Sequence, residues 1–147
     1  KLKLKYNVKK NDELKKYEII IDEIDIDIYV PFYSKLPLLE QIKNHASNIE
    51  GFKVANPEIL IILKLAAEIN RSNSEKGLKD RIDIMDLLLK CEIDFEKFNR
   101  LIEKEKLKDF RKRLTSIIGS FREIKYIDLN PREFKLRKKE LIKSYIQ

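Results

Sequence analysis

The pattern of apolar and polar residues divides the chain into a strand-rich beginning and a helical remainder. Residues 1–8, "KLKLKYNV", alternate lysine with leucine or tyrosine, which is typical of a strand with one solvated face. Asn11 and Asp12 supply turn residues before the run "YEIIIDEIDIDIYV" at 17–30. We therefore expect two adjacent strands, or one long strand with a bend, at the start of the chain.

Acidic residues interrupt the apolar run at 17–30. Because side chains alternate along a strand, Asp25 and Asp27 share one face with Glu23 and Tyr29, and the intervening residues Ile24, Ile26 and Ile28 occupy the other. We expect these isoleucines to lie buried under helices. The carboxylates have two interpretations. They form a solvated strand face, or they form a ledge for a divalent cation, since hard cations such as Mg²⁺ take oxygen ligands.

Helical spacing of apolar residues begins at residues 36–49, "LPLLEQIKNHASNI", which predict an amphipathic helix. We expect Gly51 to end this helix and "FKV" at 52–54 to form a short edge strand. His45 lies beside the apolar stripe and, without a partner acid or cysteine in a recognisable arrangement, is interpreted as structural.

Further helices are predicted over the rest of the chain. Asn56-Pro57 is a strong helix start, and the helix that follows runs to Arg71. Residues 78–90 predict a second, amphipathic helix. Beyond Asp94, a good capping residue, we expect two to three packed helices, of which the last opens at Asn130-Pro131.

Charged residues occupy one stripe of the helix that ends at Arg71. This helix is apolar almost all round, which predicts burial, yet Lys64, Glu68 and Arg71 recur at spacings that place them on a single face. Long charged side chains are seldom enclosed without partners. They either reach the surface with a Lys64–Glu68 pair, or they form part of a site.

Charge is concentrated at the end of the chain. Residues 104–147 hold 14 Lys and Arg against 6 Asp and Glu, a net charge of +8, whereas the whole chain carries +7. The blocks "RKR" at 111–113 and "KLRKK" at 135–139 can meet nucleic-acid phosphates, or they can be a solvated surface. The candidate contact residues are Arg111, Arg113, Lys138 and Lys139.

Composition limits the chemistry. The 147 residues suffice for one domain, or one domain with a helical appendage, and the enrichment in Lys, Glu and Ile is typical of heat-adapted organisms or of A+T-rich coding. A single cysteine, Cys91, and a single histidine exclude a disulfide framework or a Cys/His zinc site within the chain. We expect Cys91 to be a small apolar residue at a helix end.

The chain also lacks the patterns of a membrane or secreted protein. No apolar run approaches the length of a membrane span and no secretory signal is present, so we expect a cytoplasmic protein without a membrane partner. The chain starts at Lys1, and its single methionine is Met85, from which we expect an upstream segment to be missing.

Three segments occur in a recognisable order: the strand end "IDIYVP", the helix "PEILIILKLAAEINR" and the helix "KGLKDRIDIMDLL". Together, over residues 17–90, they resemble the nucleotidyltransferase fold of the polymerase-beta-like superfamily, especially the branch of abortive-infection-type toxins and archaeal relatives. That superfamily also has an earlier Gly-Ser turn and an Asp-x-Asp strand. The 26 residues before Asp27 contain no Gly-Ser pair, and "NDELKKYEII" has no glycine, so Asp25 and Asp27 are not interpreted as that Asp-x-Asp pair.

The resemblance implies a role for each matching residue. Asp27 takes the position of the third catalytic carboxylate and Mg²⁺ ligand, with Asp25 as the alternative if the register differs by two. Lys64, Arg71 and Lys79 match positions that face nucleotide phosphates and the cleft. The residues that would support these cations are Asp80, Asp83 and Glu68.

We therefore expect an α+β fold, with a small sheet of N-terminal strands packed by helices and then a C-terminal helical bundle. Residues 1–92 would be the later part of a nucleotidyltransferase-like domain, and 93–147 a basic helical region. The implied reaction transfers a nucleoside monophosphate from an NTP to a hydroxyl of a nucleic acid, such as a tRNA-like RNA, or of a protein, with Mg²⁺. Without the missing segment the chain alone would be inactive. The alternative is a noncatalytic basic module that binds RNA or a protein partner.

Overall fold

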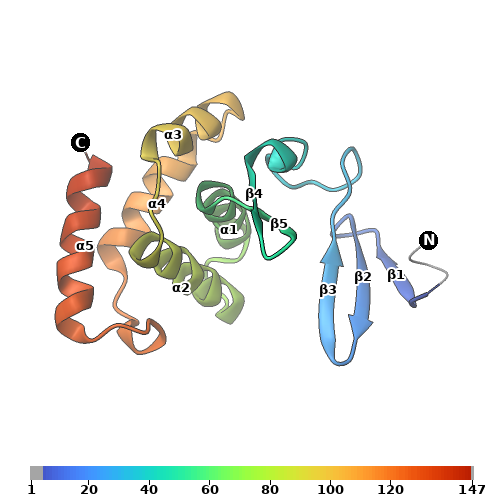
Figure 1. Cartoon of the computed structure of the whole chain (residues 1–147), viewed down its shortest axis with the longest axis horizontal. Helices are drawn as coiled ribbons and strands as arrows, with labels where there is room; N and C mark the ends of the chain where they lie inside the picture. Colours follow the sequence, from blue (N-terminus) through green and yellow to red (C-terminus); the bar gives the residue numbers. More distant parts are fainter. Residues whose placement is uncertain (1–4, 147) are drawn as a thin grey trace.

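A computed structural model of the chain describes residues 5–146, in which N-terminal strands lie to one side of a group of helices (Figure 1). The strands are β1 (Val8–Asn11), β2 (Lys16–Ile21), β3 (Ile24–Ile28), β4 (Ala46–Ile49) and β5 (Phe52–Ala55). The helices are α1 (Pro57–Arg71), α2 (Glu75–Lys90), α3 (Phe95–Lys104), α4 (Lys108–Ser120) and α5 (Pro131–Ile146), with 3₁₀ turns η2 (Ile42–His45) and η3 (Ile124–Tyr126). The predicted α+β fold with C-terminal helices is confirmed.

Tight turns join the first three strands into an antiparallel sheet of order β1-β2-β3. The Asn11 side chain accepts a hydrogen bond from the Leu14 N–H at 2.9 Å and shapes the first turn. In the second turn Asp22 and Glu23 have φ angles of 47° and 69°, a conformation suited to hairpins with right-handed twist. Residues 17–30 are thus a hairpin, and Glu23 lies in its turn instead of beside Asp25 on the strand.

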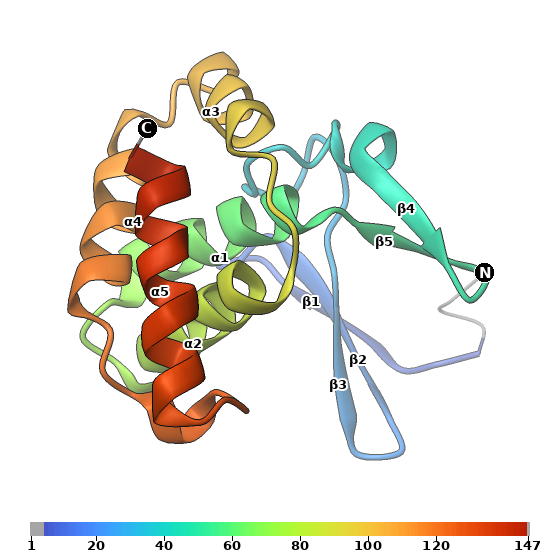
Figure 2. The same cartoon turned by 60° about the vertical axis from the view of Figure 1, so that its left-hand side comes forward.

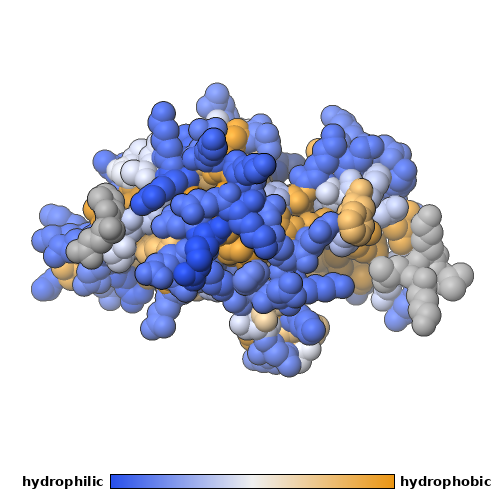
Figure 3. Space-filling view, turned by 90° about the horizontal axis from the view of Figure 1, so that it is seen from above, coloured by the Kyte–Doolittle hydropathy of each residue, from blue (hydrophilic) through white to orange (hydrophobic). Residues whose placement is uncertain are grey.

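The isoleucines of β3 are not buried, which corrects the sequence-based expectation. Ile24 is 63% exposed and Ile26 is 38% exposed. The reason is that the contiguous apolar core draws its residues from Leu38 and the helical part of the chain instead of from β1–β3. Large apolar side chains consequently remain exposed in this part of the chain, and Figure 3 shows apolar surface on the side of the molecule that carries the strands.

The prediction of a helix over residues 36–49 is also wrong. Only η2 forms there, and residues 46–49 become β4, paired antiparallel with β5. Glu50 and Gly51 have φ angles of 50° and 85° and make the connecting turn, so Gly51 belongs to a hairpin and does not end a helix. The apolar spacing instead reflects Leu38 and Ile42, which pack against the helical core.

The helices pack around α1. Helix α2 lies along α1, α3 and α4 also contact it, and α5 packs against α2 (Figure 2). The predicted starts are confirmed: Pro57 and Pro131 open α1 and α5, and the Asp94 side chain accepts the Lys97 N–H at 2.8 Å to cap α3. In the described part of the chain, no helix has the length and apolar character needed to cross a membrane.

Gly77 sets how closely the start of α2 approaches the end of α1. A Cβ atom placed on Gly77 would lie 2.2 Å from the Arg71 carbonyl oxygen, which is a backbone atom. A Cβ atom placed on Gly119 in α4 would meet no neighbouring atom within 4 Å. An alanine at Gly77 would therefore meet a steric clash, whereas an alanine at Gly119 would change the helix propensity without such a clash.

We predict that Gly77→Ala destabilises the protein although alanine is the better helix former. The shift that relieves such overpacking typically costs about 1–3 kcal/mol. Gly119→Ala is the matched control, and it should stabilise the protein by about 0.4–1 kcal/mol because only helix propensity and unfolded-chain entropy change. Thermal and urea unfolding check both values. An unchanged or raised stability of Gly77→Ala would contradict the close approach.

Candidate functional site

Glu68 lies in the middle of the charged stripe of α1 and faces α4. It is fully buried, and its Oε2 accepts a hydrogen bond from Arg113 Nε at 2.7 Å, with a second Arg113 contact to Oε1. Arg81 of α2 donates from Nη1 to Glu68 Oε1 at 2.9 Å and to the Ser72 carbonyl at 2.7 Å. One carboxylate thus joins α1, α2 and α4.

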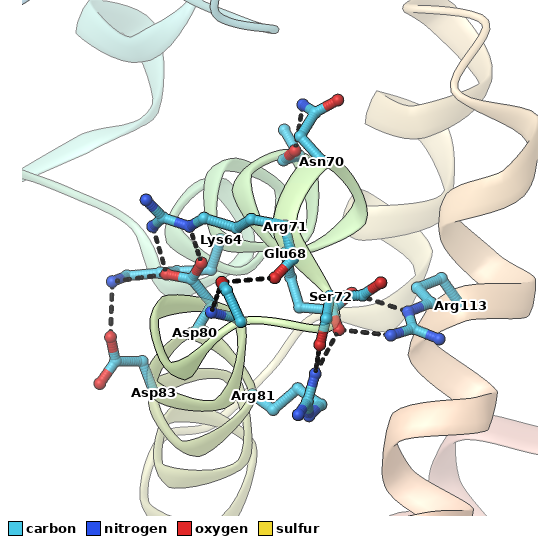
Figure 4. A network of polar contacts seen from close by, with 12 residues as sticks. Lys64, Glu68, Asn70, Arg71, Ser72, Asp80, Arg81, Asp83 and Arg113 are labelled. Carbon is cyan, nitrogen blue, oxygen red and sulfur yellow. Dashed lines mark hydrogen bonds and ion pairs between the residues drawn. The ribbon is translucent and has the colours of Figure 1, made fainter.

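Asp80 of α2 makes the corresponding contacts on the other side of the helix pair (Figure 4). It is 1% exposed, and Arg71 approaches it with two nitrogens, Nε at 2.7 Å and Nη2 at 3.0 Å. Lys64 Nζ lies 3.4 Å from Asp80 Oδ1 and also contacts Asp83. The Lys64–Glu68 pair considered from the sequence does not form. Lys64 pairs with residues of α2, and Glu68 pairs with Arg81 of α2 and Arg113 of α4.

These ion pairs fix the protonation states of the cluster. Burial opposes the charge of Lys64, but hydrogen bonds and attraction from Asp83 and Asp80 outweigh it and raise the pKa of Lys64. The hydrogen bond to Asp80 raises the pKa of Arg71. Burial of Glu68 is likewise outweighed by Arg113 and Arg81, which lower the pKa of Glu68. All three side chains are charged at neutral pH.

Tyr29 connects this cluster to the acidic strand. Its hydroxyl donates to Asp27 Oδ2 at 3.4 Å, and burial followed by the charge of Asp27 raises the pKa of Tyr29. Arg71 is close enough to oppose that shift. Asp27 and Lys64 form no direct contact within residues 5–146, and Tyr29, which is near enough to Arg71 for their charges to interact, makes no hydrogen bond to it in that range.

A cavity of about 530 Å³ lies along the carboxylate face of the sheet. Asp25 and Asp27 line it together with Lys76, which comes from the first turn of α2. Lys79 is exposed one turn further along α2, on the helix face that also carries Lys76 and Asp83, and it has no ion pair among the described residues. The cavity therefore brings the strand carboxylates to the first turn of α2, while none of the helix candidates is among the described residues that line it.

The residues around Asp27 do not fit the Mg²⁺ ion that the resemblance implies. Lys16 Nζ lies 2.8 Å and 2.7 Å from the two carboxylate oxygens of Asp27, and 3.1 Å from Glu18 Oε1. Within residues 5–146 there is no group of three or more His, Cys, Asp or Glu side chains arranged to hold a metal. An ammonium group therefore already neutralises the carboxylate proposed as a metal ligand, and no chemical step is assigned to a metal here.

The four basic residues chosen as nucleic-acid contacts have different surroundings. Arg113 is committed to Glu68, and Lys138 donates to the carbonyls of Gly119 and Phe121 at the end of α4, at 3.3 Å and 3.1 Å. Burial lowers the pKa of Lys138. Arg111 and Lys139 are exposed. Of the four, only Arg111 and Lys139 are exposed and without an ion pair or side-chain hydrogen bond among the described residues, as a contact with a phosphate at the surface requires.

Several residues of the site were not selected from the sequence. Arg81 and Lys16 each bind a candidate carboxylate, and the signal for Lys16 was its position on the same strand face as Glu18, the residue paired with Asp27. Cys91 does lie at the end of α2, but it is exposed. His45 ends η2 and is half-buried.

Comparisons of the chain with protein-family models, with curated proteins and with solved structures gave no match.

We predict that Arg113→Ala destabilises the protein strongly at neutral pH. Arg113 makes two contacts with the buried Glu68, and its loss would leave that carboxylate with Arg81 alone. Loss of a hydrogen bond to a charged group costs about 1.5–3 kcal/mol. Arg111→Ala, in the same helix and without an ion pair among the described residues, should change stability by less than about 0.5 kcal/mol.

The difference between wild type and Arg113→Ala should depend on pH. Because the pKa of Glu68 is lowered on folding, its contribution is present above the ordinary value of 4.5 and is lost as the pH falls through the lower folded-state value. Urea unfolding at pH 7 and in steps below pH 4.5 measures this difference. A difference that does not shrink on acidification would show that Arg113 does not act through Glu68.

Proposed function

We propose that this chain provides the triphosphate-binding helices of a nucleotidyltransferase-fold protein, and that Lys64 and Arg71 contact the phosphates of an NTP. The observation that carries this proposal is the fixed position of both cations. Asp80 is almost fully buried and draws Lys64 and Arg71 to one side of the α1–α2 pair, where their side chains are 39% and 41% exposed. Each cation is thus fixed by its contact with the buried Asp80, and its exposed part remains accessible to a ligand.

Donor geometry supports phosphate binding. Arg71 uses Nε and one hydrogen of Nη2 on Asp80, so the remaining guanidinium hydrogens can meet phosphate oxygens. A planar guanidinium fixed by a carboxylate is pre-organised for such contacts, because less side-chain freedom is lost when the ligand binds. Lys64 has a third ammonium hydrogen beyond those directed at Asp80 and Asp83.

The charge around the site also favours an anion. Lys64 and Arg71 balance Asp80 and Asp83, so these residues alone are neutral. Lys76 and Lys79 add positive charge on the same face of α2. Neither of these lysines has an ion pair among the described residues, so their charge favours binding of an anion on this face of α2, beside the sheet carboxylates that share a cavity with Lys76.

The resemblance extends this proposal to a reaction, the transfer of a nucleoside monophosphate from the bound NTP to a nucleic-acid or protein hydroxyl. The fixed cations suit that role, since positive charge held near a transferring phosphoryl group stabilises the charge that develops on it. The residues of this chain are assigned to binding and orientation. The resemblance also implies Mg²⁺, but the residues around Asp27 do not provide its site.

We predict that Lys64→Ala weakens NTP binding while the fold is retained. Loss of a hydrogen bond to a charged group costs about 1.5–3 kcal/mol, which corresponds to roughly 10–100-fold in Kd. Lys90→Ala is the matched control, because Lys90 is also a half-exposed lysine of a helix, paired with Asp86. It should leave the Kd unchanged. Isothermal titration with a non-hydrolysable ATP analogue and with GTP checks these values.

Two outcomes would overturn the proposal. One is saturable NTP binding that Lys64→Ala leaves intact, and the other is a protein that binds no NTP at low ionic strength. Arg71→Lys adds a further measurement, since it keeps the charge but loses the paired contact with Asp80, and we expect it to weaken binding with only a moderate loss of stability.

A second candidate function is RNA binding by the basic C-terminal helices. The exposed side chains of Arg111, Lys112, Lys135 and Lys139 on α4 and α5 favour it, together with the +8 charge of residues 104–147. Phosphate contacts of this kind give little sequence preference and strong salt dependence. A tRNA-like acceptor would be compatible with both functions.

For this second function we predict that Arg111→Ala combined with Lys139→Ala weakens RNA binding and flattens its salt dependence. Each lost phosphate contact should lower the slope of log K against log salt by about 1. Lys43→Ala with Lys53→Ala is the control, since both residues are exposed but lie outside the basic region. Fluorescence anisotropy with a labelled tRNA at several salt concentrations measures the slopes. Equal slopes for all variants would leave the basic region as ordinary surface.

A further inference from the structure

The pairing register of the sheet places two carboxylates directly opposite each other. Glu18 on β2 is the cross-strand partner of Asp27 on β3, and paired residues of adjacent strands project to the same face. Like charges in this position repel, and the repulsion destabilises the pairing unless a cation lies between them. The same arrangement of oxygens is what a hard divalent cation would need.

Lys16 supplies that cation from within the chain. It lies two residues before Glu18 on β2, on the same strand face, and its ammonium contacts both oxygens of Asp27 and one of Glu18. The Lys16 side chain is 13% exposed, against 29% for Glu18 and 41% for Asp27, so it is the least exposed of the three.

Two neighbouring groups also donate hydrogen bonds to the two carboxylates. Asn11 donates to Glu18 Oε1 at 3.0 Å, and Tyr29 donates to Asp27 Oδ2 at 3.4 Å. Burial alone would lower the pKa of Lys16, but its hydrogen bonds to Asp27 and Glu18 outweigh this and raise it. Because the Lys16 ammonium already contacts both carboxylates, a metal ion between them would have to displace it.

We propose that Lys16 is a built-in replacement for a divalent cation: its ammonium occupies the site between Glu18 and Asp27 and excludes Mg²⁺ or Mn²⁺ from it. Asp27 is then a partner of Lys16 in the native protein instead of a metal ligand. The Glu18–Asp27 pair is a latent divalent site that opens when the ammonium is removed. This inference does not depend on NTP binding by Lys64 and Arg71.

The test uses the full chain with Mn²⁺ alone, because Mn²⁺ takes the oxygen ligands that Mg²⁺ takes and its free ion is measured by electron paramagnetic resonance. Wild-type protein should show no saturable binding at the sheet below about 1 mM Mn²⁺. Lys16→Met, which removes the charge and keeps the length, should gain about one bound Mn²⁺ per chain in that range. The double variant Lys16→Met with Asp27→Asn should lose the ion again. Lys16→Arg keeps a positive charge at this position and should bind no Mn²⁺ there.

A second measurement needs no variant at position 16. Mn²⁺ broadens the amide resonances of residues that lie near its binding site, so the resonances of Glu18 and Asp27 in wild-type protein should remain sharp. Saturable broadening that Asp27→Asn abolishes would overturn the proposal, since it would place a metal on Asp27 while Lys16 is present. A folded Lys16→Met protein that gains no Mn²⁺ would overturn it as well. Both measurements are made with Mn²⁺ and without NTP. A negative result here would therefore leave the proposed binding of NTP unaffected.

Discussion

Two buried carboxylates, Glu68 and Asp80, determine how the central helices sit against one another. A carboxylate withdrawn from water is strongly unfavourable unless its charge is compensated by close partners. Glu68 finds them in Arg81 and Arg113, and Asp80 finds them in Arg71 and Lys64. Sliding α1 against α2 by one turn would break the contacts of Arg81, Arg71 and Lys64 at once. The close approach at Gly77 allows the helices to meet in this register, because no Cβ atom separates α2 from the Arg71 carbonyl.

The same contacts connect stability with the proposed site. Arg71 is the main partner of the buried Asp80, and its removal would leave that carboxylate with only the longer contact to Lys64. Lys64 is the better probe of function, since it shares Asp80 with Arg71 and also contacts the half-exposed Asp83. A cation held in this way reaches its ligand with little loss of freedom, which is the advantage of placing binding groups on packed helices.

The polar face of the sheet lies toward the first turn of α2, next to this site. Tyr29 and the first turn of α2 bring Asp27 and Asp25 near the end of the α1–α2 pair, while the isoleucine face of β3 stays exposed. Lys16 completes the balance of charge on the polar face by neutralising Asp27 and Glu18. Two acidic residues of the apolar run, Glu18 and Asp27, are thus joined through Lys16 across two strands.

The sequence by itself determined the α+β class and the helices from Asn56 onward, because their start signals and apolar spacing are local properties of the chain. It also indicated that the charged stripe of α1 needs partners. Only the tertiary structure decided which partners: Lys64 and Glu68 are one turn apart, yet their ion pairs run to α2 and α4, and such long-range choices depend on helix register. The hairpin at 46–55 was missed for a related reason, since short apolar runs fit helix and strand alike until a turn such as Glu50-Gly51 pairs them.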